Sequence, residues 1–254
     1  MGAVASKAAG KSPVWLAATV ATVAVIGVLG WPAMAQDKPF TLTQTVPRDG
    51  ARQAYVRLDM GAGELRVSGG AAGLLEGRFE YRPEHWRPEV THRTYGSRAD
   101  VRITQPPLWR WPWTLDVHNV WAIRLNDDVP TELDVRLGAG GSRLHLGNVT
   151  LSRLDVRVGA GEVTLDLRGP WRQDLSGYVH GGVGRLTVRL PDQVGVRVDV
   201  SKGLGRVEAR GLRQEGDHSF LNEWFGKAPV NIHLQVDAGV GEIVLESGSD
   251  GATA

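Results

Sequence analysis

The stretch LDVRVGAGEVTLDL, residues 154–167, contains the pattern that decides the fold of this chain. Apolar and polar residues alternate on both sides of Gly159-Ala160-Gly161, as expected for two half-buried β-strands joined by a turn. The same glycine-bracketed turn occurs six times, and three successive intervals between first glycines are 21, 23 and 21 residues. A period of this length with strand patterning predicts a stacked β architecture. The turn glycines are Gly61, Gly63, Gly138, Gly140, Gly159, Gly161, Gly182, Gly184, Gly203, Gly205, Gly239 and Gly241.

We therefore predict an all-β fold: a β-solenoid-like stack of repeated two-strand, hairpin-like units with Gly-x-Gly turns, preceded by one N-terminal signal or anchor helix. A single unit cannot bury its apolar face, whereas stacked units share a continuous core. Glycine adopts a positive φ without steric cost and lets neighbouring backbones approach closely, which suits these turns. After residue 36, helical patterning is confined to one short stretch, residues 218–227.

The polar residues that follow the turns predict how outward side chains meet between units. If the units stack in chain order, equivalent side chains lie about 4.8 Å apart, and Arg143, Glu162 and Arg185 alternate in sign. Arg185 and Arg206 would then be like-charged neighbours, and we expect local strain between them. The residue just before the first apolar position after each turn is, in chain order, Glu64, Arg143, Glu162, Arg185, Arg206 and Glu242.

The N-terminus carries the pattern of an export signal. Lys7 and Lys11 precede an apolar stretch from Val14 to Trp31, and Ala33-Met34-Ala35 follows. This pattern predicts a signal peptide cleaved after Ala35, and an uncleaved signal anchor is the alternative, because an apolar stretch of about 18 residues can span a bilayer core. Both interpretations place the body outside the cytoplasm, in the periplasm or at the cell surface.

The rest of the chain divides by composition and periodicity. We expect a signal peptide or signal anchor over 1–35, a linker over 36–50, an N-terminal β region with a Trp-rich loop over 51–120, a repeat β-solenoid over 121–246 and a disordered tail over 247–254. Whether 51–120 is a separate domain stays open at this stage.

Composition excludes several function classes. The formal net charge of +1 gives no basic field for nucleic acid. The absence of cysteine excludes disulfides, thiolate metal sites and cysteine nucleophiles. The histidines have no metal-ligand spacing, there is no Gly-x-Ser-x-Gly element, and the Gly-x-Gly turns run from strand to strand rather than from strand to helix. We predict no cofactor, no metal and no nucleic-acid partner.

Paired carboxylates are the one feature that points toward catalysis. Asp134 and Asp155 fall at equivalent places in neighbouring units, where close carboxylates can raise one pKa. Asp127, Asp128 and Asp166 are weaker candidates. Arg136 and Arg157 lie two residues beyond Asp134 and Asp155 and can neutralise them. We therefore interpret these carboxylates as part of a solvated sheet face.

Tryptophans are the best candidates for contact with a partner. Trp109, Trp111 and Trp113 alternate in a proline-rich segment that cannot be a central strand, and Trp86 lies in a proline-bracketed turn. An alternating triplet can present its rings to one face. We favour a role in capping the open end of the stack; contact with a partner or membrane and stacking on glycan are the alternatives.

These segments resemble the toast-rack domain family over roughly residues 50–246. The order of the segments is more specific than any single Gly-Ala-Gly-Glu. The matching stretches are VRLDMGAGELRVSGG (56–70), LEGRFEY (75–81), WRPEV (86–90) and WAIRLN (121–126) followed by Val129-Pro130.

The resemblance implies an all-β, solenoid-like domain with a role in envelope sensing or scaffolding. The family includes adhesin-like domains and the extracytoplasmic part of LiaF-type cell-envelope stress proteins. It carries no catalytic motif, so it assigns no functional residue here. LiaF-type proteins usually carry several apolar segments, whereas this chain has one.

We predict a non-enzymatic scaffold or interaction module of the cell envelope that binds an envelope or membrane protein, possibly anchored by its N-terminal segment and acting in a stress response. A surface adhesin or glycan-binding module that uses Trp109, Trp111, Trp113 and Trp86 is the alternative. An enzyme acting on an envelope polysaccharide through Asp134 and Asp155 is the third hypothesis.

Overall fold

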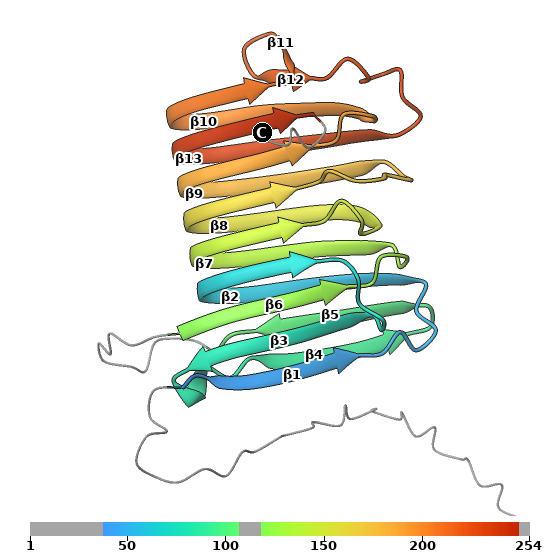
Figure 1. Cartoon of the computed structure of the whole chain (residues 1–254), viewed down its shortest axis with the longest axis vertical. Coiled ribbons are helices and arrows are strands. Elements are labelled where there is room, and N and C mark those ends of the chain that lie inside the picture. The colour runs from blue at the N-terminus through green and yellow to red at the C-terminus, as the bar shows by residue number, and fades with distance from the viewer. Residues whose placement is uncertain (1–37, 107–117, 249–254) are drawn as a thin grey trace, which may run out of the picture.

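The computed structural model describes residues 38–106 and 118–248. They form thirteen strands of one mixed sheet and one short 3-10 helix, η2 (Glu84–Trp86), which confirms the all-β class (Figure 1). The N-terminal helix that we expected over 1–35 lies outside the described residues. The strands are β1 (Phe40–Val46), β2 (Gln53–Ser68), β3 (Leu75–Arg82), β4 (Glu89–Tyr95), β5 (Arg98–Thr104), β6 (His118–Leu125), β7 (Thr131–His145), β8 (Leu151–Asp166), β9 (Leu175–Leu190), β10 (Gly195–Arg210), β11 (Arg213–Glu215), β12 (Ser219–Leu221) and β13 (Asn231–Ser247).

Each Gly-x-Gly segment is a bend inside one long strand, not a hairpin turn between two. β2, β7, β8, β9, β10 and β13 run unbroken through their bends and are 15–17 residues long. We call each bent strand a rung, with a first arm before the bend and a second arm after it. Each arm pairs in parallel with the same arm of the neighbouring rung. The expected hairpin-like pairing within a unit was therefore wrong, although the repeat and the stack were predicted correctly.

The rungs do not stack in chain order. Their order is β2, β7, β8, β9, β13, β10, so β13 lies between β9 and β10 (Figure 1). Glu242 of β13 therefore pairs in register with Arg185 on one side and Arg206 on the other. The like-charged contact that we expected between these two arginines does not form, because the last rung in the sequence inserts an acid between them.

One further register assignment was wrong. Gly141, and not Arg143, lies opposite both Glu64 and Glu162. Arg143 is two positions further along the second arm and reaches back to form an ion pair with Glu64. Ser142 takes the inward position next to the bend. The first charged outward residue of β7, Arg143, is therefore two residues further from the bend than Glu64 or Glu162.

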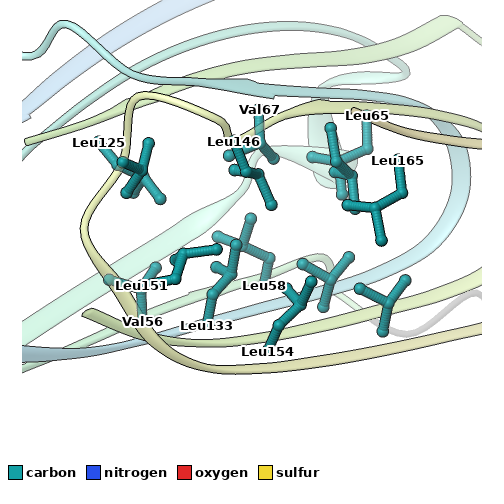
Figure 2. Close-up of a cluster of buried hydrophobic side chains, with 14 of the residues drawn as sticks. Val56, Leu58, Leu65, Val67, Leu125, Leu133, Leu146, Leu151, Leu154 and Leu165 are labelled. Carbon is teal, nitrogen blue, oxygen red and sulfur yellow. The ribbon is translucent and has the colours of Figure 1, made fainter. Parts of the chain in front are cut away.

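The core fills the space between the two arms of every rung. Figure 2 shows the first-arm side chains, among them Leu58 and Leu133, facing second-arm side chains such as Leu65 and Leu165. All four are at most 1 % exposed. Full burial of a leucine contributes about 1.5–3 kcal/mol, and the core runs without a break from β1 to β10. Strict alternation along both arms is what places these residues inside and their neighbours outside.

The bends require glycine because successive backbones touch there. Gly161 has a φ of +135°, and a Cβ at this position would lie 1.8 Å from the carbonyl oxygen of Gly140 in the rung below. No side chain fits at that distance. Stacked bends therefore explain the recurrence of glycine more fully than turn geometry alone.

The N-terminal end departs from the repeat. There β5 pairs in parallel with the first arm of β2 and β6 with its second arm, so two separate strands replace one bent rung. β4 pairs with β5, and β3 and then β1 extend the sheet beyond β6, all antiparallel. The sheet continues across residue 120, since β2 pairs with β7.

Two local expectations were wrong. Residues 36–50 were expected to be a linker, but residues 40–46 form β1 and bury Leu42 and Val46 against β3. Residues 218–227 were expected to allow a short helix, but they contain β12 followed by turns. In both places the tertiary pairing of a neighbouring strand decides the conformation, which local patterning cannot anticipate.

Candidate functional site

The outward faces of the arms carry rows of side chains, and the predicted carboxylate pair lies in one of them. Asp134 and Asp155 are direct register partners on β7 and β8. Asp134 accepts hydrogen bonds from Arg136 at 3.2 Å and from the Tyr55 hydroxyl at 3.3 Å. Asp155 accepts one from Arg157 at 2.7 Å. The two carboxylates are therefore brought together as expected, and each forms an ion pair with the arginine two residues further along its own strand.

The weaker carboxylate candidates have structural roles. Asp166 accepts a hydrogen bond from Arg168 at 2.6 Å; burial would raise the pKa of Asp166, but the bonds from Arg168 outweigh it and lower the pKa. Asp127 accepts the backbone N–H of Gly70 at 2.9 Å and so fixes a loop. Asp128 is exposed in the same turn. These residues do not converge on one site.

A serine, an aspartate and a histidine do converge at the C-terminal end, and sequence reasoning missed them. The Ser219 hydroxyl donates to Asp199 Oδ1 at 2.5 Å, and His233 Nε2 lies 2.6 Å from Asp199 Oδ2. Burial raises the pKa of Asp199, but hydrogen bonds from Arg197, Ser219 and His233 outweigh it and lower the pKa strongly. The aspartate lies between the other two residues, so the histidine cannot take the serine proton as a nucleophilic triad requires. The cluster ties β10, β12 and β13 together.

The predicted tryptophan contacts separate into two groups. Trp86 is buried at 7 % exposure and belongs to the hydrophobic core, a position that gives it no surface for a partner. Trp109, Trp111 and Trp113 lie outside the described residues. Among the described tryptophans, Trp224 is the one that is exposed, at 43 %.

Two polar side chains close the N-terminal end of the stack at the bend of β2. Gln105 accepts the backbone N–H groups of Gly61 at 2.9 Å and Ala62 at 3.3 Å. Asn119 donates to the Ala62 carbonyl at 2.7 Å and to Gln105 at 3.0 Å, and it accepts the Trp121 indole N–H at 2.9 Å. These amides take the place of the backbone that a further bend would supply. No sequence pattern marks them, because they meet only after β5 and β6 have each paired with an arm of β2.

The bends also form an exposed apolar surface that sequence analysis did not single out. The middle residues of the six Gly-x-Gly bends line up along the stack, and we call them the apolar ridge. They are small on β2, β7 and β8 and larger on the last three rungs, where Val183, Val240 and Leu204 are 57 %, 47 % and 75 % exposed. In stack order the ridge is Ala62, Ala139, Ala160, Val183, Val240 and Leu204.

The described residues show no group of three histidine or acidic side chains arranged to hold a metal ion. Over residues 38–106 and 118–248, no helix is long and apolar enough to cross a bilayer. The segment that we expected to be a signal peptide or a signal anchor, residues 1–35, is outside these ranges.

Comparison with known proteins identifies relatives of both the sequence and the fold. A family model described as the N-terminal domain of toast_rack, DUF2154, matches residues 35–189. A crystal structure of a "putative cell adhesion protein" from Clostridium sporogenes is 33 % identical, with a TM-score of 0.81; the match covers 83 % of this chain and 100 % of that one. A "putative adhesin" from Bacteroides fragilis matches 82 % of this chain and 97 % of its own at 10 % identity, with a TM-score of 0.31. No protein of curated function matches the chain.

Proposed function

This chain belongs to the toast-rack family, and from that premise we propose that it is a non-enzymatic interaction module held outside the cytoplasm, which binds an envelope or membrane protein. The stack acts as a rigid display of outward rows and of the apolar ridge. A part in an envelope stress response belongs to the same proposal, on the strength of the family resemblance.

The observation that carries this proposal is the apolar ridge. The middle residue of each bend points away from the core, so a polar residue would be tolerated there as well as an apolar one. All six positions are apolar, and the largest three are adjacent on β9, β13 and β10. Contiguous exposed apolar side chains on a soluble surface typically mark a contact site.

A surface adhesin is the second candidate. It is favoured by the 33 % identical structure, whose whole length this chain covers and which is named as a "putative cell adhesion protein". On this alternative the contact is a cell-surface glycan, held by Trp109 and Trp111 of the Trp-rich loop.

In-cell cross-linking tests the two candidates. A photo-reactive residue is placed at Leu204 on the apolar ridge, and a matched one at Tyr95, which is also exposed but lies on β4 at the other end of the stack. With an affinity tag after Ala254, intact cells are irradiated and the captured molecules are identified by mass spectrometry.

Reproducible capture of one envelope protein from Leu204 and not from Tyr95 supports the interaction module. Co-purification with cell-wall glycan, lost in Trp109→Ala and Trp111→Ala, supports the adhesin. Recovery of the chain in the cytoplasmic fraction, with no capture from either position, overturns both.

A further inference from the structure

The C-terminal end of the stack is open along one arm. The first arm of β10 is covered, because β12 pairs with Arg197, Val198 and Asp199. The second arm, from Gly205 to Arg210, pairs with β13 on one side, and no described strand pairs with its other side. Figure 1 shows β10 as the last rung, with β11 and β12 beyond it at the same end of the stack.

Beside this edge lies a cleft of about 1100 Å³ whose lining combines polar residues with a few apolar side chains at its floor. Val207 and Ala209 point inward from β10 but are only partly buried, since none of the described strands covers them. Leu212 and Phe220 complete the floor. In the interior of the stack the same inward positions are fully buried, as at Ile243 and Leu245 of β13. A further second arm would cover Val207 and Ala209 in the same way.

The charges of the second arms follow a rule that stops at this edge. Two outward rows, four residues apart, alternate acid and base from β8 to β10. In stack order the first row is Glu162, Arg185, Glu242 and Arg206, and the second is Asp166, Arg189, Glu246 and Arg210.

Interior and edge arginines differ in their neighbours. Arg189 lies between two acids, 3.9 Å from Asp166 and 3.5 Å from Glu246. Arg210 has Glu246 on one side, at 3.1 Å, and Glu208 of its own strand at 3.3 Å; no described rung lies on its other side. Arg206 likewise binds Glu242 at 2.6 Å on its inner side and lies 3.5 Å from Glu208 of its own strand. The pattern ends on two arginines whose outer neighbours are absent among the described residues.

We propose that the second arm of β10 binds an extended segment of a partner protein, which adds to the sheet as a parallel strand. Five residues of the segment face residues 206–210. The first and the fifth are acidic, opposite Arg206 and Arg210, and the second and the fourth are apolar. Its pattern is acid–apolar–any–apolar–acid. Main-chain hydrogen bonds supply affinity and the side-chain rows supply register and specificity. This rests on the proposed function and names the chemistry of the partner.

The neighbouring rungs show which kind of strand pairs with a second arm of this charge pattern. β9 presents RLTVR (185–189) and β10 presents RVEAR (206–210). The strand that adds to β9 is β13, whose matching residues are EIVLE (242–246). Because β10 offers the same arginine spacing and a free edge, the strand it accepts has the character of this segment.

A second copy of the chain fits this edge less well. The corresponding edge at the N-terminal end is β1, FTLTQTV, which has no acidic residue to face Arg206 and Arg210. The other N-terminal edge strand, β4, reads EVTHRTY and has a single acid. Charge complementarity therefore favours a different protein.

One contact limits where the added strand begins. Lys202 Nζ donates to the Gly205 carbonyl at 2.8 Å, so it shields the bend of β10. A lysine at an exposed edge is a common guard against unwanted pairing. The segment open to a partner is accordingly 206–210.

A synthetic peptide tests the rule directly. The probe is GVGEIVLES, residues 239–247 of this chain, added to the purified full-length protein; the control peptide has lysine in place of both glutamates. We expect the probe to bind at least about tenfold more tightly than the control, since two charge pairs become two repulsions. Hydrogen exchange should slow at 206–210. Arg206→Gln with Arg210→Gln should remove the preference, whereas Arg213→Gln on β11 should not.

A disulfide test reports register, because the chain has no cysteine of its own. Glu208→Cys should trap a peptide that carries cysteine at the position of Val244. Thr187→Cys, at the same place on the interior rung β9, should not, because strands cover β9 on both sides.

Absence of binding at about 1 mM peptide, or equal binding of the two peptides, overturns the proposal. So does self-association of the protein through the β10 edge, detected by a concentration-dependent mass that Arg206→Gln with Arg210→Gln abolishes. None of these results affects cross-linking from the apolar ridge in cells, which tests the proposed function separately.

Discussion

At the N-terminal end of the stack, the amides of Gln105 and Asn119 satisfy the bend of β2, and β5 and β6 cover both of its arms. At the C-terminal end, β12 covers the first arm of β10 and leaves the second arm unpaired among the described residues. A repeat stack must end somewhere, and an uncovered rung exposes both apolar surface and backbone groups. The difference teaches that the first rung, β2, has both arms covered by further strands, whereas the last rung, β10, keeps its second arm available among the described residues.

The interior bends show how two neighbouring rungs pack, and both ends are compared with them. Gly161→Ala should disrupt this packing. Its φ is positive and its new Cβ would lie 1.8 Å from the Gly140 carbonyl oxygen. We expect a loss of about 3–5 kcal/mol in the free energy of unfolding, measured by denaturant titration. Gly141→Ala is the matched control, since a Cβ there meets nothing within 4 Å. Equal effects of the two substitutions would contradict backbone contact between bends.

Removing the N-terminal closure should have the next largest effect. Asn119→Ala leaves the Ala62 carbonyl and the Trp121 indole N–H without their partner in a buried site. We expect a loss of about 2–3 kcal/mol in unfolding free energy and faster hydrogen exchange at the β2 bend. The exposed Asn148 provides the control, and Asn148→Ala should change stability by less than about 0.5 kcal/mol. A small effect at Asn119 would mean that β6 alone closes this end.

The C-terminal end should show its own dependence on pH through Asp199. The pKa of Asp199 in the folded protein lies below its ordinary value of 3.8, because its hydrogen bonds outweigh burial. Its contribution is therefore present above pH 3.8 and is lost as the pH falls further.

Asp199→Asn should lower unfolding free energy at neutral pH by about 1–2 kcal/mol, allowing for partial exposure. It should also flatten the acid limb of the stability curve, measured by thermal unfolding from pH 7 to pH 2. Asp217→Asn, on the exposed loop before β12, is the control. An unchanged acid limb in Asp199→Asn would show that the cluster does not hold β12 on β10.

Sequence periodicity predicted the repeat and the inward residues well, because alternation and glycine spacing are local properties. It could not predict that β13 inserts between β9 and β10, since residues 211–230 allow the chain to pass one rung and return. The like charges of Arg185 and Arg206 were the available sign that chain order fails. The carboxylate pair of β7 and β8 was placed correctly because it depends on the same local alternation and glycine spacing.

The contacts at the ends were beyond such reasoning. Gln105 and Asn119 are ordinary polar residues in the sequence, and their role depends on β5 and β6 replacing one rung. The free edge of β10 likewise follows from the order of strands and not from any motif. End effects in a repeat protein are set by tertiary pairing, whereas its interior is set by the repeat.

The smallest expected effect sharpens the comparison between interior and edge. Glu242 accepts hydrogen bonds from Arg185 at 2.8 Å and Arg206 at 2.7 Å, and those from Arg206 contribute most to lowering the pKa of Glu242. Glu242→Gln removes the acid between two cations, so it should lower the melting temperature by less than Asp199→Asn does. Because both arginines are exposed and Glu242 is partly exposed, the loss should shrink at high salt, where exposed charges are screened. Glu162→Gln, in the same row on β8, is the control. A salt-independent loss of melting temperature in Glu242→Gln alone would show that packing rather than charge alternation orders the last three rungs. If instead the charge rule holds for β9, β13 and β10, the same rule applied once more at the free edge requires an acidic strand beyond Arg206 and Arg210.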